Sequence, residues 1–484
     1  MKIRFANWQP DLQGLTNPGM QDAKNVYPIG GGGYGPIKAL AEVSTTGLSA
    51  TCQGAISAID STGTTQTFAG DASKLYKLTA GVFSDVSKGG GYSVGTTDRW
   101  EFVQYGQRVI ATQISNPPQY YDLGSSTLFA DLAGSPPQAR HAAVVRDFVV
   151  LGNTATSPNQ LAWSGFNDSA GWTAGSNQSD TQTLQGGGWI QAIVGGEVGY
   201  IFQEHAITRM TYVGPPAIFQ FDAVETARGL AAPAALIKLG SLVYYWAQDG
   251  FYVFDGAQSV SIGDSKVDNW FSTHLQGNTF AQITCGADPA NKLVYWSFVS
   301  TDAVSAANPD TVIIYNWLTK EWSYAKFAHE MLFSDLTQGV TLEQLSAQYP
   351  IIENVPVSFD SRVWTGGAAY LSAFDTSHQL CNFSGSNLAA ILEPSDQEPI
   401  PGRRSLVTNI RPFVDTSAVT AIVRSRERFA DSTKDTSAAS MQASGDIPVT
   451  SSGRFHRPQL TIPAASTWTF ASGLEMDAED DGEI

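Results

Sequence analysis

The sequence predicts an all-β protein: a β-propeller of six blades with an additional smaller β-domain. Three observations support this prediction. Short runs of β-branched and aromatic residues alternate with two-residue turns, similar units recur between residues 51 and 327, and the pattern changes after residue 328. Equivalent hairpins are spaced by about 40–50 residues, which is the period expected of propeller blades.

The clearest unit lies at residues 236–262. Leu236–Leu239 and Leu242–Trp246 are separated by Gly-Ser, Phe251–Phe254 follows, and Asp-Gly then precedes Ser259–Ile262. Both dipeptides supply the positive φ that a tight hairpin turn needs. Four antiparallel strands in so short a segment have the size of one blade.

Equivalent hairpins occur along the rest of this region. Their strand pairs are 65–69 with 74–78, 100–105 with 108–112, 142–145 with 148–151, 190–194 with 198–202, and 292–298 with 311–315. The repeat is one of hairpin rhythm and not of residue identity. A β-sandwich is the alternative all-β architecture, but it needs no period this regular.

The remaining segments complete a division of the chain into five parts. These are an N-terminal segment 1–50 that closes or docks the propeller, the blades 51–327, a connecting segment 328–388, a C-terminal β-domain 389–474 and an acidic tail 475–484. The connecting segment is predicted to contain a short helix at 341–345 and strands at 356–367 and 370–374.

The composition fits a folded protein with a weakly charged surface. Hydrophobic residues make up 42% and aromatic residues 11% of the chain, enough for a packed interior, while charged residues make up only 15%. The formal net charge is −17. Because nonspecific DNA binding depends on Lys and Arg neutralising phosphates, this charge disfavours conventional electrostatic binding of DNA.

Membrane insertion, secretion and disulfide bonding are not expected. No apolar run is long enough to span a bilayer, and the first residues lack the apolar core of a secretory signal. Cys52, Cys285 and Cys381 lie far apart without paired spacing. They are predicted to be small buried hydrophobic residues in a protein made in a cytoplasm.

Several short motifs suggest chemistry, but their contexts favour structural roles. Gly91–Gly95 matches Gly-x-Ser-x-Gly, yet a serine-hydrolase turn needs a helix after it, and a strand is predicted there. Gly30–Gly35 matches Gly-x-Gly-x-x-Gly without a helical pattern behind it. Asp477–Gly482 begins like an EF-hand loop but lacks the bidentate Glu six residues after the glycine. No catalytic, cofactor-binding or metal-ligating residues are therefore assigned, and no cofactor is predicted.

Two sets of polar residues have more than one interpretation. The six histidines, at 141, 205, 274, 329, 378 and 456, show no metal-ligand spacing. Arg424, Arg426 and Arg428 share one face of a predicted strand because their spacing is two. They either pair with the subunit's own acidic residues or contact an acidic neighbouring subunit.

A series of motifs, in order along nearly the whole chain, resembles a known family. The motifs are Trp8–Asp11, Asn17–Gly19, Asn25–Pro28, Gly33–Pro36, Val357–Gly367, Phe374–Asp375, His378–Gly385, Arg411–Pro412, Arg424–Arg426, Ser452–Arg454, His456–Arg457 and Trp468–Gly473. Together they resemble the tail nozzle (hub or tail tubular) proteins of short-tailed bacteriophages, which are described as six-bladed propellers with added β-domains.

The resemblance implies a structural virion protein, not an enzyme. It implies a homo-oligomeric ring, usually a hexamer, that lines the DNA ejection channel below portal and adaptor proteins, retains and then releases packaged DNA, and carries tail fibres or spikes. Double-stranded DNA would pass through without specific binding. The protein would be located in the virion tail after assembly in the bacterial host cytoplasm.

The acidic charge suggests how such a channel would work. A lumen lined mainly by Asp, Glu and neutral polar residues would repel the duplex from the wall over a Debye length of about 10 Å at 0.1 M salt. Two other classes remain open, since one fold hosts many functions. One is a propeller glycosidase, depolymerase or receptor-binding tail protein acting on host surface polysaccharide, which as an enzyme would need a carboxylate pair. The other is a propeller adaptor inside a cell.

Overall fold

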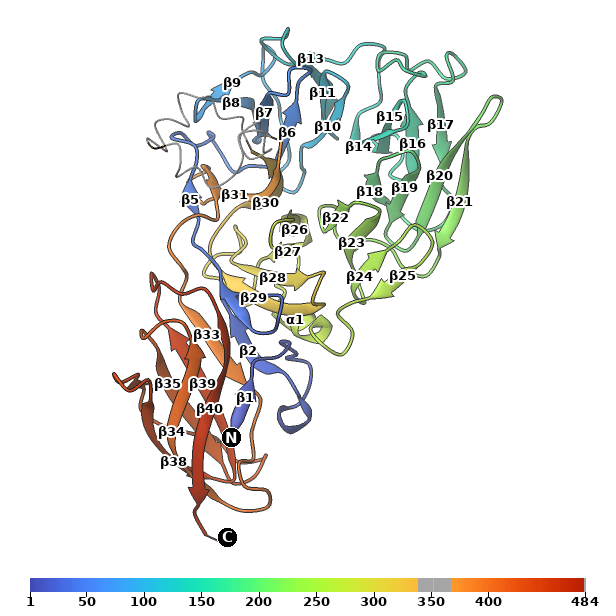
Figure 1. Cartoon of the computed structure of the whole chain (residues 1–484). Helices are drawn as coiled ribbons and strands as arrows, with labels where there is room; N and C mark the ends of the chain where they lie inside the picture. Colours follow the sequence, from blue (N-terminus) through green and yellow to red (C-terminus); the bar gives the residue numbers. More distant parts are fainter. Residues whose placement is uncertain (338–350, 352–366, 483–484) are drawn as a thin grey trace.

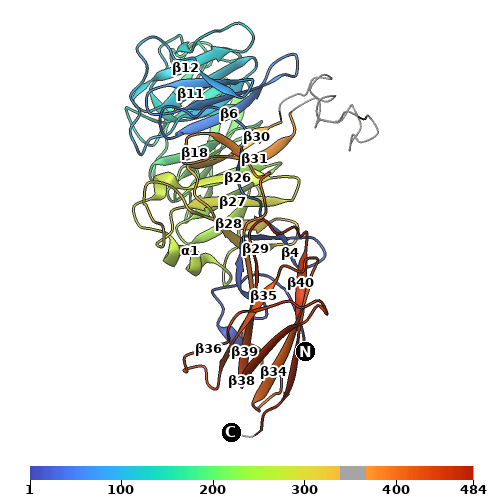
Figure 2. The ribbon, with the colours of Figure 1, turned by 90° about the vertical axis from the view of Figure 1, so that its left-hand side faces the viewer.

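The computed structural model describes residues 1–337, 351 and 367–482. A propeller and a smaller β-sandwich are joined end to end, so the molecule is elongated (Figures 1 and 2). The first strand, β1 (Lys2–Arg4), and the last, β40 (Ala471–Asp480), both lie in the sandwich. The all-β propeller class predicted from the sequence is confirmed.

Five consecutive blades are four-stranded antiparallel meanders. Blade 1 contains β6 (Gly54–Ile59), β7 (Thr65–Gly70), β8 (Leu75–Thr79) and β9 (Val82–Asp85); blade 2 contains β10 (Glu101–Tyr105), β11 (Arg108–Gln113), β12 (Asn116–Asp122) and β13 (Ala130–Asp131). Blade 3 contains β14 (Ala139–Val145), β15 (Phe148–Thr154), β16 (Gln160–Trp163) and β17 (Asp180–Thr183); blade 4 contains β18 (Ile190–Val194), β19 (Gly199–Gln203), β20 (Ile207–Gly214) and β21 (Ile218–Glu225). Blade 5 contains β22 (Leu236–Leu239), β23 (Leu242–Ala247), β24 (Gly250–Phe254) and β25 (Ser259–Ser261).

Two further blades complete the ring within the described residues. Blade 6 contains β26 (Thr284–Asp288), β27 (Leu293–Phe298), β28 (Thr311–Asn316) and β29 (Glu321–Lys326). Blade 7 contains β30 (Met331–Leu336), β31 (Ala369–Phe374), β32 (Leu380–Asn382) and β5 (Ala41–Glu42). The innermost strands β30 and β6 contact each other, which closes the ring, and aromatic pairs such as Phe202–Tyr245 pack blade 4 on blade 5.

The prediction of six blades was therefore wrong, because the described residues form seven. Blade 7 takes three strands from the segment 328–388, which was predicted to be a connection, and its outermost strand from β5 near the start of the chain. A blade assembled from two distant segments leaves no continuous hairpin rhythm in the sequence. A long insertion between β30 and β31 hides the period further.

The sandwich consists of two facing sheets. One contains β3 (Val26–Pro28), β4 (Tyr34–Pro36), β40, β34 (Ser405–Val414) and β38 (Ile447–Gly453), with β1 paired to β40. The other contains β2 (Met20–Lys24), β33 (Ala390–Pro394), β39 (Phe455–Ile462), β35 (Thr420–Arg426), β36 (Lys434–Asp435) and β37 (Ala439–Ser440). This second sheet continues blade 6, because β2 pairs in parallel with β29 at Lys24 and Tyr324.

The prediction that residues 475–484 form an acidic tail was wrong for most of this segment. Strand β40 runs to Asp480 and pairs with β34 along that stretch. Leu474 and Met476 are fully buried, whereas Asp477 and Glu479 are exposed. The acidic composition concealed this two-residue alternation of a half-buried strand.

Helices are few and short in the part of the chain that the structure describes. They are α1 (Asp268–His274) and the 3-10 turns η1 (Gly14–Thr16) and η2 (Phe280–Gln282). Across the described ranges, no helix is long and apolar enough to cross a membrane. The predicted helix at 341–345 and nearly all of the predicted strand at 356–367 lie outside the described residues. Cys52 and Cys381 are buried, Cys285 is half-buried, and all three are free thiols.

Candidate functional site

The first candidate site is the junction between blade 6 and the sandwich, where Asn25 links the two. Its backbone N–H donates to the carbonyl of Tyr324 at 2.8 Å, and its side-chain oxygen accepts from the N–H of Lys326 at 2.8 Å. Its side-chain amide donates to the carbonyl of Ala389, just before β33, at 2.7 Å. Asn25 has φ of 59°, a left-handed conformation that asparagine tolerates better than most residues.

Trp8 lies at the same junction, where it contacts Tyr324, the residue whose carbonyl accepts from Asn25. It is 1% exposed, its ring packs edge-on against Trp270 of α1 with centroids 4.7 Å apart, and it lies 4.9 Å from the ring of Tyr324 in β29. Its indole N–H donates to the carbonyl of Gln21. The N-terminal segment thus wedges an aromatic side chain between the propeller and strand β2.

Asn17 anchors the same segment. Its side-chain oxygen accepts from the N–H of Gly19 at 2.8 Å, its amide donates to the carbonyl of Gln9 at 2.9 Å, and its own carbonyl accepts from the hydroxyl of Ser395 at 2.7 Å. Three motifs of the N-terminal block, those containing Trp8, Asn17 and Asn25, therefore converge on one junction.

Arginine–carboxylate pairs stiffen the sandwich sheet next to this junction. Arg424 and Arg457 both contact the buried carboxylate of Glu393, and Arg426 lies 2.6 Å from Asp396. Two of the three arginines that were predicted to share a strand face, Arg424 and Arg426, therefore pair with acidic residues of the same subunit. Arg428 lies beyond the end of β35. Beside them, burial raises the pKa of Asp22, although hydrogen bonding to the Tyr324 hydroxyl opposes the shift.

The short motifs occupy ordinary structural positions. Gly91–Gly95 lies in the loop between β9 and β10, with Tyr92 and Val94 buried, and no helix follows it. Gly30–Gly35 contains the turn between β3 and β4. Within the described ranges, no group of three or more His, Cys, Asp or Glu side chains is arranged to hold a metal ion.

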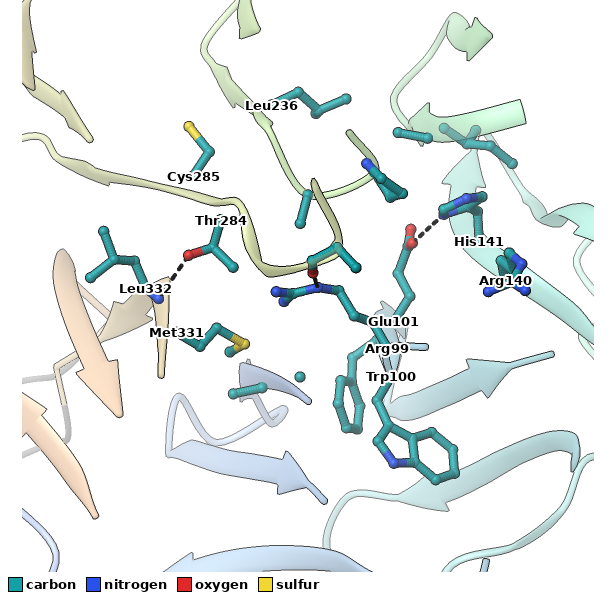
Figure 3. Close-up of a pocket in the computed structure, with 18 of the residues that line it drawn as sticks. Arg99, Trp100, Glu101, Arg140, His141, Leu236, Thr284, Cys285, Met331 and Leu332 are labelled. Carbon is teal, nitrogen blue, oxygen red and sulfur yellow. Dashed lines mark hydrogen bonds and ion pairs between the residues drawn. The ribbon is translucent and has the colours of Figure 1, made fainter. Parts of the chain in front are cut away.

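The second candidate site is a cavity of about 300 Å³ on the propeller axis, which Figure 3 shows in close-up. Every innermost strand contributes to its wall: Gly54 and Ala55 of β6, Glu101 and Phe102 of β10, Arg140 and His141 of β14, Ala192 and Ile193 of β18, Leu236 of β22, Thr284 and Cys285 of β26, and Met331 and Leu332 of β30. Thr97, which is exposed, also lines the cavity and marks its mouth.

Arg99 extends across this cavity from the side of Trp100 toward the side of Thr284 and Met331 (Figure 3). Its Nε donates to the carbonyl of Ala281 at 2.9 Å. Burial lowers the pKa of the Arg99 guanidinium to about 10, so it remains charged at neutral pH.

His141 lies on another part of the cavity wall. It is 4% exposed, and its Nδ1 lies 2.7 Å from a carboxylate oxygen of Glu101. Its Nε2 is buried without a hydrogen-bond partner in the described part of the chain. The neighbouring Arg140 pairs with Asp98 at the rim.

Sequence reasoning singled out Trp8, Asn17 and Asn25 as motif residues without bringing them together, and it missed the cavity. His141 was noted only as one of six histidines without metal spacing, and Arg99 was not singled out. Residues of the cavity come from seven different blades and those of the junction from both ends of the chain, so no local pattern brings them together.

The comparisons with known proteins concern the fold. No family model and no curated protein matches the chain. Among solved structures, an extracellular domain from B. thetaiotaomicron is 10% identical with a TM-score of 0.43, and the match covers 79% of this chain and 44% of that one. The WD40 domain of Neurospora crassa Pan2 is 8% identical with a TM-score of 0.38, covering 71% and 94%. The computationally designed Ika8 protein is 12% identical with a TM-score of 0.35, covering 70% and 98%.

The chain thus spans less than half of the first of these structures. Its own strand topology defines the class: a seven-bladed β-propeller whose sixth blade runs on into a β-sandwich.

Proposed function

We propose that this chain is a structural subunit of the tail nozzle of a short-tailed bacteriophage. In this proposal it does no chemistry and forms a homo-oligomeric ring, a hexamer, below the portal and adaptor proteins. The ring lines the DNA ejection channel of the virion tail, retains and then releases packaged DNA, and carries fibres or spikes on its outside.

The observation that supports this proposal most is the location of the N-terminal motifs that resemble the nozzle family. Trp8, Asn17 and Asn25 all lie at the junction and join the propeller to the sandwich. A ring subunit must hold its domains at a fixed angle, because one head-to-tail interface is repeated around a closed ring. Residues that fix this angle are what such subunits would have in common.

The net charge of −17 also supports a channel that does not hold DNA. Each Lys or Arg contact with a phosphate would retard a passing duplex. An acidic wall repels the duplex instead.

Light scattering combined with negative-stain imaging tests the ring. We expect particles with about six times the chain mass of 51.8 kDa and a central bore. Filter binding with linear duplex DNA at low salt should show no retention. A protein that stays monomeric at high concentration and releases reducing sugar from host polysaccharide would instead support the depolymerase alternative.

A further inference from the structure

We propose that the contact between the N-terminal segment and helix α1 is a proton-controlled joint. When the carboxylate of Asp268 takes up a proton, Asp11 holds α1 more tightly and the junction between propeller and sandwich becomes stiffer. The joint does not require the proposed ring, since all of its residues belong to one chain.

Asp11 attaches the N-terminal segment to α1, which lies at the end of the propeller that faces the sandwich (Figure 1). Its carboxylate oxygens accept from the N–H groups of Asn269 at 2.8 Å and Trp270 at 2.7 Å. A helix cannot satisfy these first N–H groups by itself. The N–H of Asp11 donates to the carbonyl of Lys266 at 3.1 Å. Since Trp8 packs against the ring of the same Trp270, the segment is held to α1 at two points.

Asp268, the first residue of α1, places a second carboxylate beside this attachment. The residue is half-buried, and its Oδ1 accepts from the N–H of Phe251 in β24 at 3.0 Å. Its carboxylate lies between two glycines. A Cβ atom on Gly250 would be 2.3 Å from Oδ2, and one on Gly263 would be 2.0 Å from Oδ1. This close packing against backbone holds the carboxylate in place.

The environment of Asp268 disfavours its ionised form. Burial raises the pKa of Asp268 to about 7, against the opposing hydrogen bond from Phe251. The negative charges of Asp11, Asp264 and Asp249 add to this rise.

The basic residues nearby serve other carboxylates or lie elsewhere on the helix. Arg228 pairs with Asp249 at 2.9 Å. The charge of Lys266 acts on Glu321, where it opposes the rise in pKa that burial causes. His274 is at the other end of α1.

Two carboxylates therefore meet at one end of α1. A helix N-terminus favours negative charge, and Asp11 already occupies the N–H groups that provide this effect. An ionised Asp268 adds a like charge beside Asp11 and so opposes the attachment of the segment. A proton on Asp268 removes that repulsion and leaves the hydrogen bonds of Asp11 intact.

The attachment should weaken as the pH rises. The pKa of Asp268 is about 7 in the attached state, against an ordinary value of 3.8, so release of the segment is accompanied by loss of a proton between these two values. The attachment weakens as the pH rises toward 7 and changes little at higher pH. With an ordinary pKa in the released state, the released population rises about tenfold between pH 6 and pH 8.5.

Hydrogen exchange of the full chain at pH 6 and pH 8.5 tests the proposal, after correction for the intrinsic exchange rates. We expect the amides of Asn269 and Trp270, which donate to Asp11, to open about tenfold more often at pH 8.5. Asp268→Asn keeps the size of the side chain and an acceptor for Phe251 but carries no charge. Its protection at these amides should be the same at both pH values.

Small-angle X-ray scattering tests the stiffness of the junction. The distribution of interdomain distances should be broader at pH 8.5 than at pH 6 in the wild type, and equal at both in Asp268→Asn. A matched control is Asp264→Asn, which removes a neighbouring exposed charge but leaves the half-buried carboxylate, so most of the tenfold change should remain.

Asp11→Asn provides a second test that holds even where Asp268→Asn does not fold. Removal of the like charge should move the midpoint of the exchange change to lower pH. Equal exchange at both pH values in the wild type, the same change in Asp268→Asn, or an unmoved midpoint in Asp11→Asn would overturn the proposal. A pH-dependent exchange with unchanged scattering would overturn the stiffening of the junction.

Discussion

At the scale of single residues, close backbone packing fixes the identity of Gly19 at the junction. A Cβ atom at this position would lie 2.0 Å from the carbonyl oxygen of Asn7. We expect Gly19→Ala to lower the free energy of unfolding by about 1–3 kcal/mol, as overpacking does elsewhere. Gly277 is the matched control, because a Cβ there meets nothing within 4 Å. Urea denaturation measures both variants, and equal stabilities would contradict the close approach.

The buried His329 makes stability depend on pH. Its Nε2 lies 2.5 Å from the Ser297 hydroxyl, and burial lowers its pKa from 6.5 to about 4. Below pH 6.5 the unfolded chain binds a proton that the folded chain refuses, so stability falls as the pH drops toward 4. The full effect is roughly 3 kcal/mol, from 1.36 kcal/mol per pKa unit.

His329→Gln should therefore be less stable than the wild type at pH 7 but lose less stability between pH 6.5 and 4. Thermal unfolding across this range measures the difference. His205→Gln, at an exposed position, should keep the wild-type slope. Parallel pH profiles for the wild type and His329→Gln would show that the histidine is protonated equally in both states.

At the scale of elements, the sequence predicts the blades that are formed by one continuous segment of the chain. The unit at 236–262 matches blade 5 nearly strand for strand, since Gly-Ser and Asp-Gly occupy its turns as expected. Blade 7 escaped prediction because β5 is separated from β32 by almost the whole propeller. The polar segment 431–452 contains β36, β37 and all of β38 except its last residue, none of which the sequence revealed. Short strands rich in Ser and Thr show little hydrophobic alternation, so period alone does not reveal them.

A buried carboxylate, that of Asp335, contributes hydrogen bonds to the closure of the ring between blades 7 and 1. Asp335 is 1% exposed and accepts hydrogen bonds from the hydroxyls of Ser57, Tyr370 and Ser372. Asp335→Ala would leave these hydroxyls without their acceptor, and we expect a loss of about 2–4 kcal/mol. Hydrogen exchange should show reduced protection in blades 1 and 7 but not in the sandwich. Asp180→Ala, at an exposed position, is the control. A uniform loss of protection would show that the contacts of Asp335 do not stabilise the ring closure locally.

At the scale of the whole molecule, two domains share one sheet, since blade 6 continues through β2 into the sandwich. A single parallel pair at Lys24 and Tyr324 is a weak link by itself. The junction side chains must therefore provide the rest of the stiffness. This continuity could not be predicted from the sequence, because β2 and β29 are about 300 residues apart and their pairing leaves no local pattern.

Trp8 is the side chain on which the angle between propeller and sandwich should depend most. Trp8→Ala removes its ring contacts with Trp270 and Tyr324, and a buried Trp→Ala change costs about 3–5 kcal/mol. Removing the ring leaves a void between the two domains. We therefore expect small-angle X-ray scattering to show a broader distribution of interdomain distances. Trp163→Ala in blade 3 removes a side chain of the same type, also nearly fully buried, but remote from the sandwich. It should lower stability without changing the scattering of the folded protein. Identical scattering from the wild type and Trp8→Ala would mean that the shared sheet alone sets the angle, and that the junction motifs serve only the stability of the chain.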